Sequence, residues 1–225
     1  MFYGAAEFSR DCDIVIVADD ENLSRLKQAL AELNAECIAL PPFDREFWQR
    51  GHAIHFRCHR PDVKGIRLDI MTAMRGCDSF EQLWERRASV ADENGMVYEL
   101  LGIEDLVKAK KTQQDKDWPM IQRLVDAHYD EFHASPSQDQ VRFWLRESRI
   151  PEVLTALAIE FPERCQQLSA TRPLLTEALL GNSDALKSKL REEESAERVA
   201  DENYWQPLKA ELHQLREERR NNPID

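Results

Sequence analysis

Two aspartates, one residue apart, open a strongly apolar segment near the start of the sequence. Asp11 and Asp13 precede the run Ile-Val-Ile-Val at 14–17. Side chains alternate between the two faces of a β-strand, so both carboxylates point to one side, about 6.6 Å apart along the backbone. Aspartate is seldom buried beside apolar residues unless it is paired or binds a metal ion. A strand that begins with two solvated acids is the alternative, and the pattern alone leaves both interpretations open.

A third carboxylate, Asp69, lies inside the apolar segment IRLDIM at 66–71. Leu68 and Ile70 must face the core, so alternation places Asp69 on the opposite face. We expect the three acids to share one sheet surface without arginines to balance them, so that cations must intervene. Mg²⁺ prefers carboxylate oxygens and leaves positions open for water and phosphate. Two ions about 3.5–4 Å apart at Asp11 and Asp13 would suit phosphoryl or nucleotidyl transfer, with Asp69 binding one ion and accepting the proton of the attacking hydroxyl.

The elements that must position these acids predict an α+β fold. A strand at 9–17 leads into an amphipathic helix at 21–35, which Asp19 or Asp20 caps. Two alternating segments flank a turn with Pro61, Asp62 and Gly65, and they predict a β-hairpin over 52–73 that carries Asp69 in its second arm.

Helices dominate the rest of the chain. The further predicted elements are a helix at 79–87, a strand at 95–101, and helices at 102–114, 116–129, 138–148, 151–160, 173–180, 183–194 and 201–219. The segment FHASPSQ reads as a linker, and no strand pattern follows it. We therefore expect a mixed sheet with flanking helices in a domain over 1–130 and an all-helical domain over 131–225.

Composition limits the functional classes. Thirty Lys and Arg against 42 Asp and Glu give a net charge of −12, which disfavours broad binding to duplex DNA. No apolar run approaches the roughly 20 residues that span a bilayer, and no secretory signal is recognisable, so we expect a cytoplasmic protein without a membrane partner. Five scattered cysteines are typical of reduced thiols rather than of a disulfide framework.

The segment YGAAEFSRDCDIVI at 3–16 resembles a recurrent motif of nucleotidyltransferases of the DNA polymerase β superfamily. In that motif Tyr-Gly and then Ser or Thr precede an Asp-x-Asp that opens a strand, and Tyr3, Gly4 and Ser9 stand at the matching positions ahead of the aspartate pair. Asp69 matches the third carboxylate of the family, on a later strand. The resemblance covers about 1–130 and is nearest to the branch with toxin components of abortive-infection and toxin-antitoxin systems, where a helical C-terminal portion is common.

A second segment, EDLVKAKKTQQDKD at 104–117, resembles the family's acidic-Leu-hydrophobic segment with a lysine and a following Lys-Asp pair. Lys110, Lys116 and Asp117 fall at those positions. The resemblance implies Mg²⁺-dependent transfer of a nucleoside monophosphate from an NTP to a hydroxyl of a protein, an RNA or a small molecule. The aspartates would bind the ions, and Ser9 and Lys110 would contact the nucleotide.

Several alternatives stay open. The family carries a Gly-Gly or Gly-Ser turn upstream of the aspartate pair, and the sequence begins after that position, so we expect either an internal start or a member without the turn. The second case favours a catalytically impaired binding partner in a toxin-antitoxin or regulatory pair. A nuclease or other metal-dependent phosphoesterase would use similar carboxylates. Lys110 stands between Lys108 and Lys111 in a run typical of a solvated helix face. His55 and His59 would share a strand face without Cys58, which disfavours a zinc site.

Overall fold

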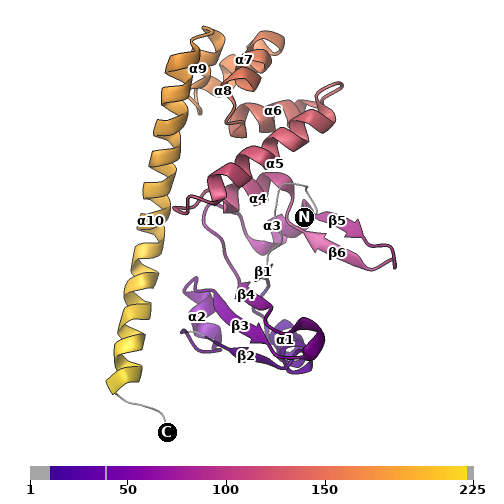
Figure 1. Cartoon of the computed structure of the whole chain (residues 1–225), viewed down its shortest axis with the longest axis vertical. Helices are drawn as coiled ribbons and strands as arrows, with labels where there is room; N and C mark the ends of the chain where they lie inside the picture. Colours follow the sequence, from indigo (N-terminus) through magenta and orange to yellow (C-terminus); the bar gives the residue numbers. More distant parts are fainter. Residues whose placement is uncertain (1–10, 39, 222–225) are drawn as a thin grey trace. The chain divides into compact units, whose positions relative to one another are not determined.

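The computed structural model describes residues 11–38 and 40–221, which divide into two compact units (Figure 1). The sheet unit consists of the described residues up to Gly102, together with 203–221. The helical unit comprises Ile103–Glu202. The domain boundary expected at residue 130 stays a prediction.

A mixed four-stranded sheet forms the centre of the sheet unit. Its strands are β1 (Asp11–Val15), β2 (Ala35–Cys37), β3 (Ile54–Cys58) and β4 (Arg67–Met71), in the order β1-β4-β3-β2. β1 runs parallel to β4, whereas β4, β3 and β2 pair antiparallel. The predicted hairpin is confirmed as β3 and β4, joined through the short 3₁₀ helix η1 (Pro61–Val63).

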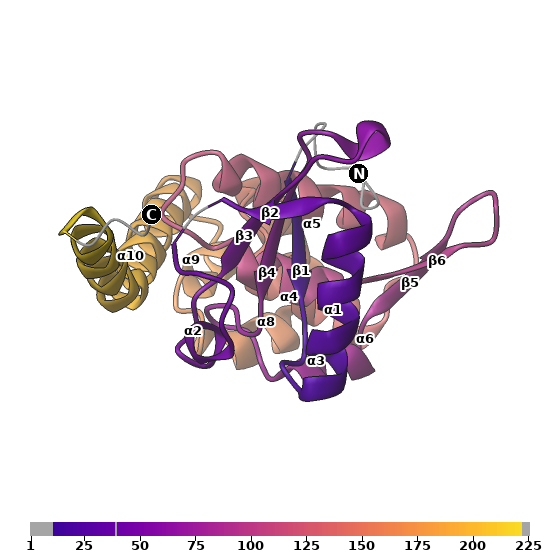
Figure 2. The same cartoon turned by 90° about the horizontal axis from the view of Figure 1, so that it is seen from below.

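Two helices cover the apolar face of this sheet: α1 (Asp20–Glu32) and α2 (Arg45–Gln49) (Figure 2). The Asp19 carboxylate accepts the Asn22 N–H at 2.7 Å and so caps α1. Leucines repeat along α1 at three- and four-residue spacing and pack on the sheet. The buried core residues here are Ile16, Leu30, Trp48, Ile54, Phe56, Cys58, Leu68 and Ile70.

A short helix and a second hairpin complete the sheet unit before the chain turns helical. Ser79 caps α3 (Phe80–Glu85) in a reciprocal arrangement with Gln82. β5 (Ala88–Ala91) then pairs antiparallel with β6 (Val97–Leu100). The strand at 97–100 was predicted, and β5 was not, because ASVA is too short for its alternation to stand out.

The helical unit has one continuous apolar core. Its helices are α4 (Ile103–Ala109), α5 (Asp117–Phe132), α6 (Gln138–Glu147), α7 (Pro151–Glu160), α8 (Pro162–Ser169), α9 (Leu175–Leu179) and the first part of α10 (Ser183–Asn221). Trp118, Trp144 and Leu157 are among its buried side chains. No strand occurs in the described residues after β6.

The prediction of separate helices at 183–194 and 201–219 is wrong, because α10 is one helix from Ser183 to Asn221. The intervening SAERVA contains no glycine or proline and consists mainly of residues compatible with a helix. Pro207 lies within α10 and lacks the N–H that would continue the helical hydrogen bonds there.

These elements confirm the α+β fold class, with a mixed four-stranded sheet and helices followed by a largely helical region that ends in a long helix. Across 11–38 and 40–221, no helix combines the length and the apolarity needed to cross a membrane.

Candidate functional site

The face of the sheet opposite α1 and α2 is polar, and we call it the polar face. Strand register arranges its side chains in two neighbouring rows. The first row is Glu36, Arg57, Arg67 and Asp11, and the second is His55, Asp69 and Asp13. Leu68 and Ile70, which alternate with these positions, are buried on the other face, as predicted.

Asp13 and Asp69 are direct register partners on the parallel strands β1 and β4. Neighbouring strands lie about 4.8 Å apart, so the two carboxylates start from adjacent backbone positions on one face. Asp11 lies two residues before Asp13 and is the register partner of Arg67. The structure therefore places Asp11, Asp13 and Asp69 on the same sheet surface.

The Asp69 carboxylate is held by Arg67 and His55. Arg67 donates from Nε to Oδ1 at 2.7 Å and from Nη2 to Oδ2 at 2.8 Å, which is a two-pronged ion pair within one strand. The Nδ1 atom of His55 lies 2.8 Å from Oδ1 and 3.2 Å from Arg67 Nη2. His55 donates to the carboxylate when Nδ1 carries the proton. These contacts orient Asp69 on the polar face.

The same contacts set the charge state of the pair. Burial by itself raises the pKa of Asp69, but the hydrogen bonds from His55 and Arg67 and their charges outweigh it, so this pKa lies below its usual value. The hydrogen bond to Asp69 raises the pKa of Arg67, and the charges of Asp11 and Asp13 raise it further. All three carboxylates thus stabilise one positive charge.

This arrangement corrects the expectation that no arginine balances the acids, because Arg67 neutralises Asp69 directly. Within 11–38 and 40–221, no three His, Cys, Asp or Glu side chains form a group that could hold a metal ion. Asp11 and Asp13 are exposed, and Asp69 is half-buried.

The other predicted contacts lie elsewhere. Ser9, with Tyr3 and Gly4, falls outside the described residues. Lys110 follows α4 in the helical unit, so its contact with nucleotide phosphates stays a prediction. Asp117, at the start of α5, is buried and accepts a hydrogen bond from Thr112 Oγ1 at 2.5 Å.

Sequence comparisons leave these residues to be judged on their geometry. No protein-family model matches the chain, and no curated protein is significantly similar to it in sequence.

Sequence reasoning missed three residues of the polar face: His55, Arg57 and Arg67. Two signals were available. Arg67 precedes Asp69 by two residues and so shares its face in any strand, and the hairpin register places His55 opposite Asp69. The sequence did not define how many residues the turn contains, so it could not fix that register.

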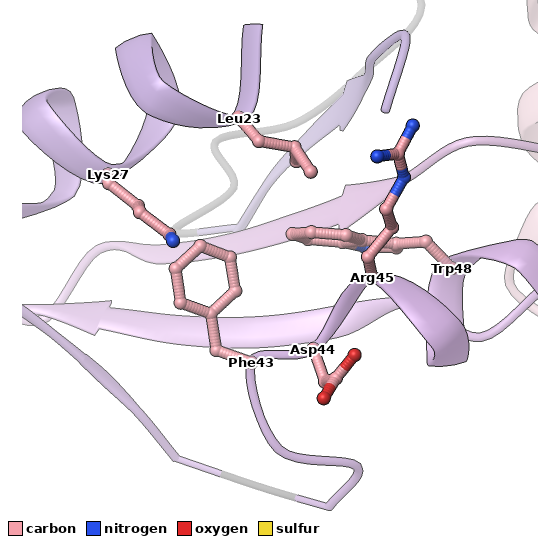
Figure 3. A pocket seen from close by; sticks show the side chains of 6 residues that line it. All are labelled: Leu23, Lys27, Phe43, Asp44, Arg45 and Trp48. Carbon is pink, nitrogen blue, oxygen red and sulfur yellow. The ribbon is translucent and has the colours of Figure 1, made fainter. Parts of the chain in front are cut away.

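A cavity of about 230 Å³ lies at a different place in the sheet unit, between α1 and the segment around α2 (Figure 3). Leu23, Phe43 and Trp48 form its apolar lining, and the Lys27 ammonium lies 5.8 Å from the centre of the Phe43 ring. The cavity adjoins the apolar core, whereas the carboxylates point from the polar face. It therefore contributes nothing to the aspartate site.

Proposed function

We propose that the chain is a cytoplasmic Mg²⁺-dependent nucleotidyltransferase, which moves a nucleoside monophosphate from an NTP to an acceptor hydroxyl and releases pyrophosphate. The supporting observation is the register of β1 and β4. It aligns Asp13 with Asp69 on one sheet face, with Asp11 two residues away on the same side.

The polar face suits Mg²⁺ in its donor chemistry. Carboxylate oxygens are the ligands that this ion prefers, and here three carboxylates together already stabilise the cationic Arg67. Asp11 and Asp13 would hold the ion or ions, and Asp69 would join them as the third carboxylate. When bound, Mg²⁺ would neutralise the triphosphate and the charge that develops during transfer.

The chain's own groups would do the remaining work. Asp69 would accept the proton of the acceptor hydroxyl, and His55 would keep its carboxylate oriented through the contact to Oδ1. Ser9 and Lys110 would contact the nucleotide, as the family resemblance implies. The acceptor would be a protein, an RNA end or a small molecule.

A second candidate is a binding partner with this fold but without the chemistry, in a toxin-antitoxin or regulatory pair. The observation that favours it is the two-pronged hold of Arg67 on Asp69, since both carboxylate oxygens already accept hydrogen bonds.

Labelled nucleotides separate the two candidates. The full chain is incubated with each labelled NTP, Mg²⁺ and cell extract, and label on any acceptor is measured. We expect transfer by the wild type and a loss of at least about a hundredfold in Asp13→Ala, because even changes outside a metal's ligand shell cost ten- to hundredfold.

The matched control is Asp20→Ala, which removes an exposed aspartate from α1, on the other side of the sheet. It should transfer label like the wild type. Absence of transfer by the wild type to every acceptor would defeat the enzyme and favour the binding partner.

A further inference from the structure

Arginines from neighbouring strands face each other on the polar face. Arg57 on β3 is the direct register partner of Arg67 on β4, and both side chains point to the side that carries the aspartates. Like charges directly opposite each other destabilise an antiparallel pair. Asp69 offsets this repulsion at Arg67, and a bound anion would offset the charge that Arg57 still presents.

The two arginines differ in their partners. Arg67 is committed to Asp69 through two hydrogen bonds. Arg57 is exposed, and within 11–38 and 40–221 its side chain makes no hydrogen bond or ion pair. Its other register partner, Glu36, instead places a carboxylate oxygen 3.4 Å from His59 Nε2. Arg57 thus presents an unused guanidinium group beside a shared one.

The position of Arg67 next to the row that contains Asp69 determines how Arg67 would respond to a bound anion. Arg67 stands between Arg57 and Asp11 in one row and contacts Asp69 in the next. A phosphate group offers several charged oxygens to both guanidinium groups, whereas Asp69 contacts only one of the two, that of Arg67. A phosphate bound at Nε and Nη2 of Arg67 would therefore compete with Asp69 for these two donors.

We propose that Arg57 and Arg67 form the binding subsite for the pyrophosphate portion of the nucleotide, and that phosphate binding releases Asp69 from Arg67. The inference rests on the proposed transferase function, and it adds residues that the family resemblance does not assign. Arg57 is available to the ligand before binding. Arg67 contacts Asp69 before binding and phosphate after it. Release leaves Asp69 open beside Asp13, its register partner.

Inorganic pyrophosphate tests the subsite without turnover. Its binding to the full chain is measured by titration calorimetry in metal-free buffer of low ionic strength. We expect Arg57→Gln to weaken binding about tenfold, as the loss of one charge-assisted hydrogen bond predicts. The same charge change at Arg25, which lies on α1 and is exposed, should leave the dissociation constant unchanged.

The competition makes an opposite prediction for the carboxylate. Asp69→Asn removes the competitor for Arg67, so pyrophosphate binding should tighten severalfold. Circular dichroism and thermal melting of each variant confirm that it is folded. Absence of wild-type binding, an unchanged constant in Arg57→Gln, or equal weakening in Arg25→Gln would each overturn the inference.

Further experimental outcomes distinguish a failure of this inference from a failure of the proposed function. Pyrophosphate binding that depends on Arg57, without label transfer, keeps the subsite and rejects the transferase. Label transfer by Arg57→Gln with an unchanged KM for NTP rejects the subsite and keeps the transferase. Arg57-dependent binding of a single-stranded RNA without binding of pyrophosphate would also reject the subsite.

Discussion

Arg172 in the helical unit and Arg67 in the sheet unit each grip a carboxylate with two nitrogens, yet their surroundings differ. Arg172 is buried, and it holds both oxygens of Glu193 at 2.9 Å. Arg67 holds Asp69 in the same way, but the Arg67 side chain is 36% exposed, against 7% for Arg172. The same ion-pair geometry thus occurs in two environments within one chain.

The other contacts around the two arginines show how their environments differ. Arg172 also donates to the carbonyl oxygens of Leu145 and Ser148, and Arg149 makes a second contact to Glu193. Each charged side chain of this group has an oppositely charged partner, as buried ionised groups require. On the polar face Arg57 has no such partner among the described residues, so charge is left available to a ligand.

The largest expected effect comes from breaking the buried network. Glu193→Gln would leave Arg172 without its carboxylate and Arg149 with only that of Glu194 at 3.9 Å, and removing one member of a buried ion pair costs about 3 kcal/mol or more. Denaturant unfolding followed by tryptophan fluorescence measures this loss. Pyrophosphate binding to the sheet unit should persist at temperatures where the variant is folded.

The adjacent residue supplies the control. Glu192 pairs with Lys189 at 2.8 Å on the exposed side of α10. Because exposed pairs contribute little, Glu192→Gln should give the wild-type unfolding midpoint. Equal destabilisation by the two variants would show that burial does not distinguish the Glu193 network.

A smaller effect is expected from the ion pair on the sheet. Asp69→Asn removes the negative charge that Arg67 pairs with and the acceptor for Arg67 Nη2, which we expect to cost about 1 kcal/mol after allowance for solvent screening. The folded state lowers the pKa of Asp69, so its contribution is present above the ordinary aspartate pKa and disappears as pH falls through the lower folded value.

Denaturant unfolding at several pH values checks that sign. The stability difference between wild type and Asp69→Asn should shrink below about pH 4, where the carboxylate begins to protonate. A difference that grows on acidification would contradict the ion pair as the source of the stability.

The positions of the aspartates were predictable because strand alternation is a local rule. Asp11, Asp13 and Asp69 each follow from an apolar segment with a period of two, and the structure puts them on one face. The partners of Asp69 depend on which residues the hairpin aligns. A shift of one residue would have turned His55 to the other face, so the sequence pattern alone could not assign it.

Helix boundaries show the same limit. Caps and proline spacing located α6 and α7 closely, because Ser137 and Pro151 act on the adjacent turn. The continuity of α10 was missed because the segment 195–200, which joins the two predicted helices, has no periodic apolar pattern. Arg198 in this segment instead donates a hydrogen bond to the Gln113 carbonyl oxygen at 3.1 Å. Tertiary contacts of this kind leave no periodic apolar signal in the sequence.

The smallest expected effect comes from a carboxylate of the helical unit that, unlike the charged groups around Glu193, has a buried oxygen atom without a partner in the described part of the chain. Asp126 on α5 has a buried Oδ1 without a hydrogen-bond partner among the described residues. Burial, with a further contribution from the charge of Asp130, raises the pKa of Asp126 to about 6. Between the unfolded pKa near 3.8 and this value, the folded chain holds a proton that the unfolded chain has lost.

Asp126 should therefore lower stability as pH rises from about 4 to above 6, and Asp126→Asn should remove that dependence. We expect a gain of about 1 kcal/mol at pH 8 and almost none at pH 4, since the half-buried group is partly screened by water. Asp130→Asn, which removes only the neighbouring charge, should give a smaller gain of the same sign. A less stable Asp126→Asn at pH 8 would mean that the ionised carboxylate makes a favourable interaction that exceeds the cost of its burial. Asp126 would then not be an uncompensated charge in the helical unit, and it could not be compared with Arg57 on the polar face.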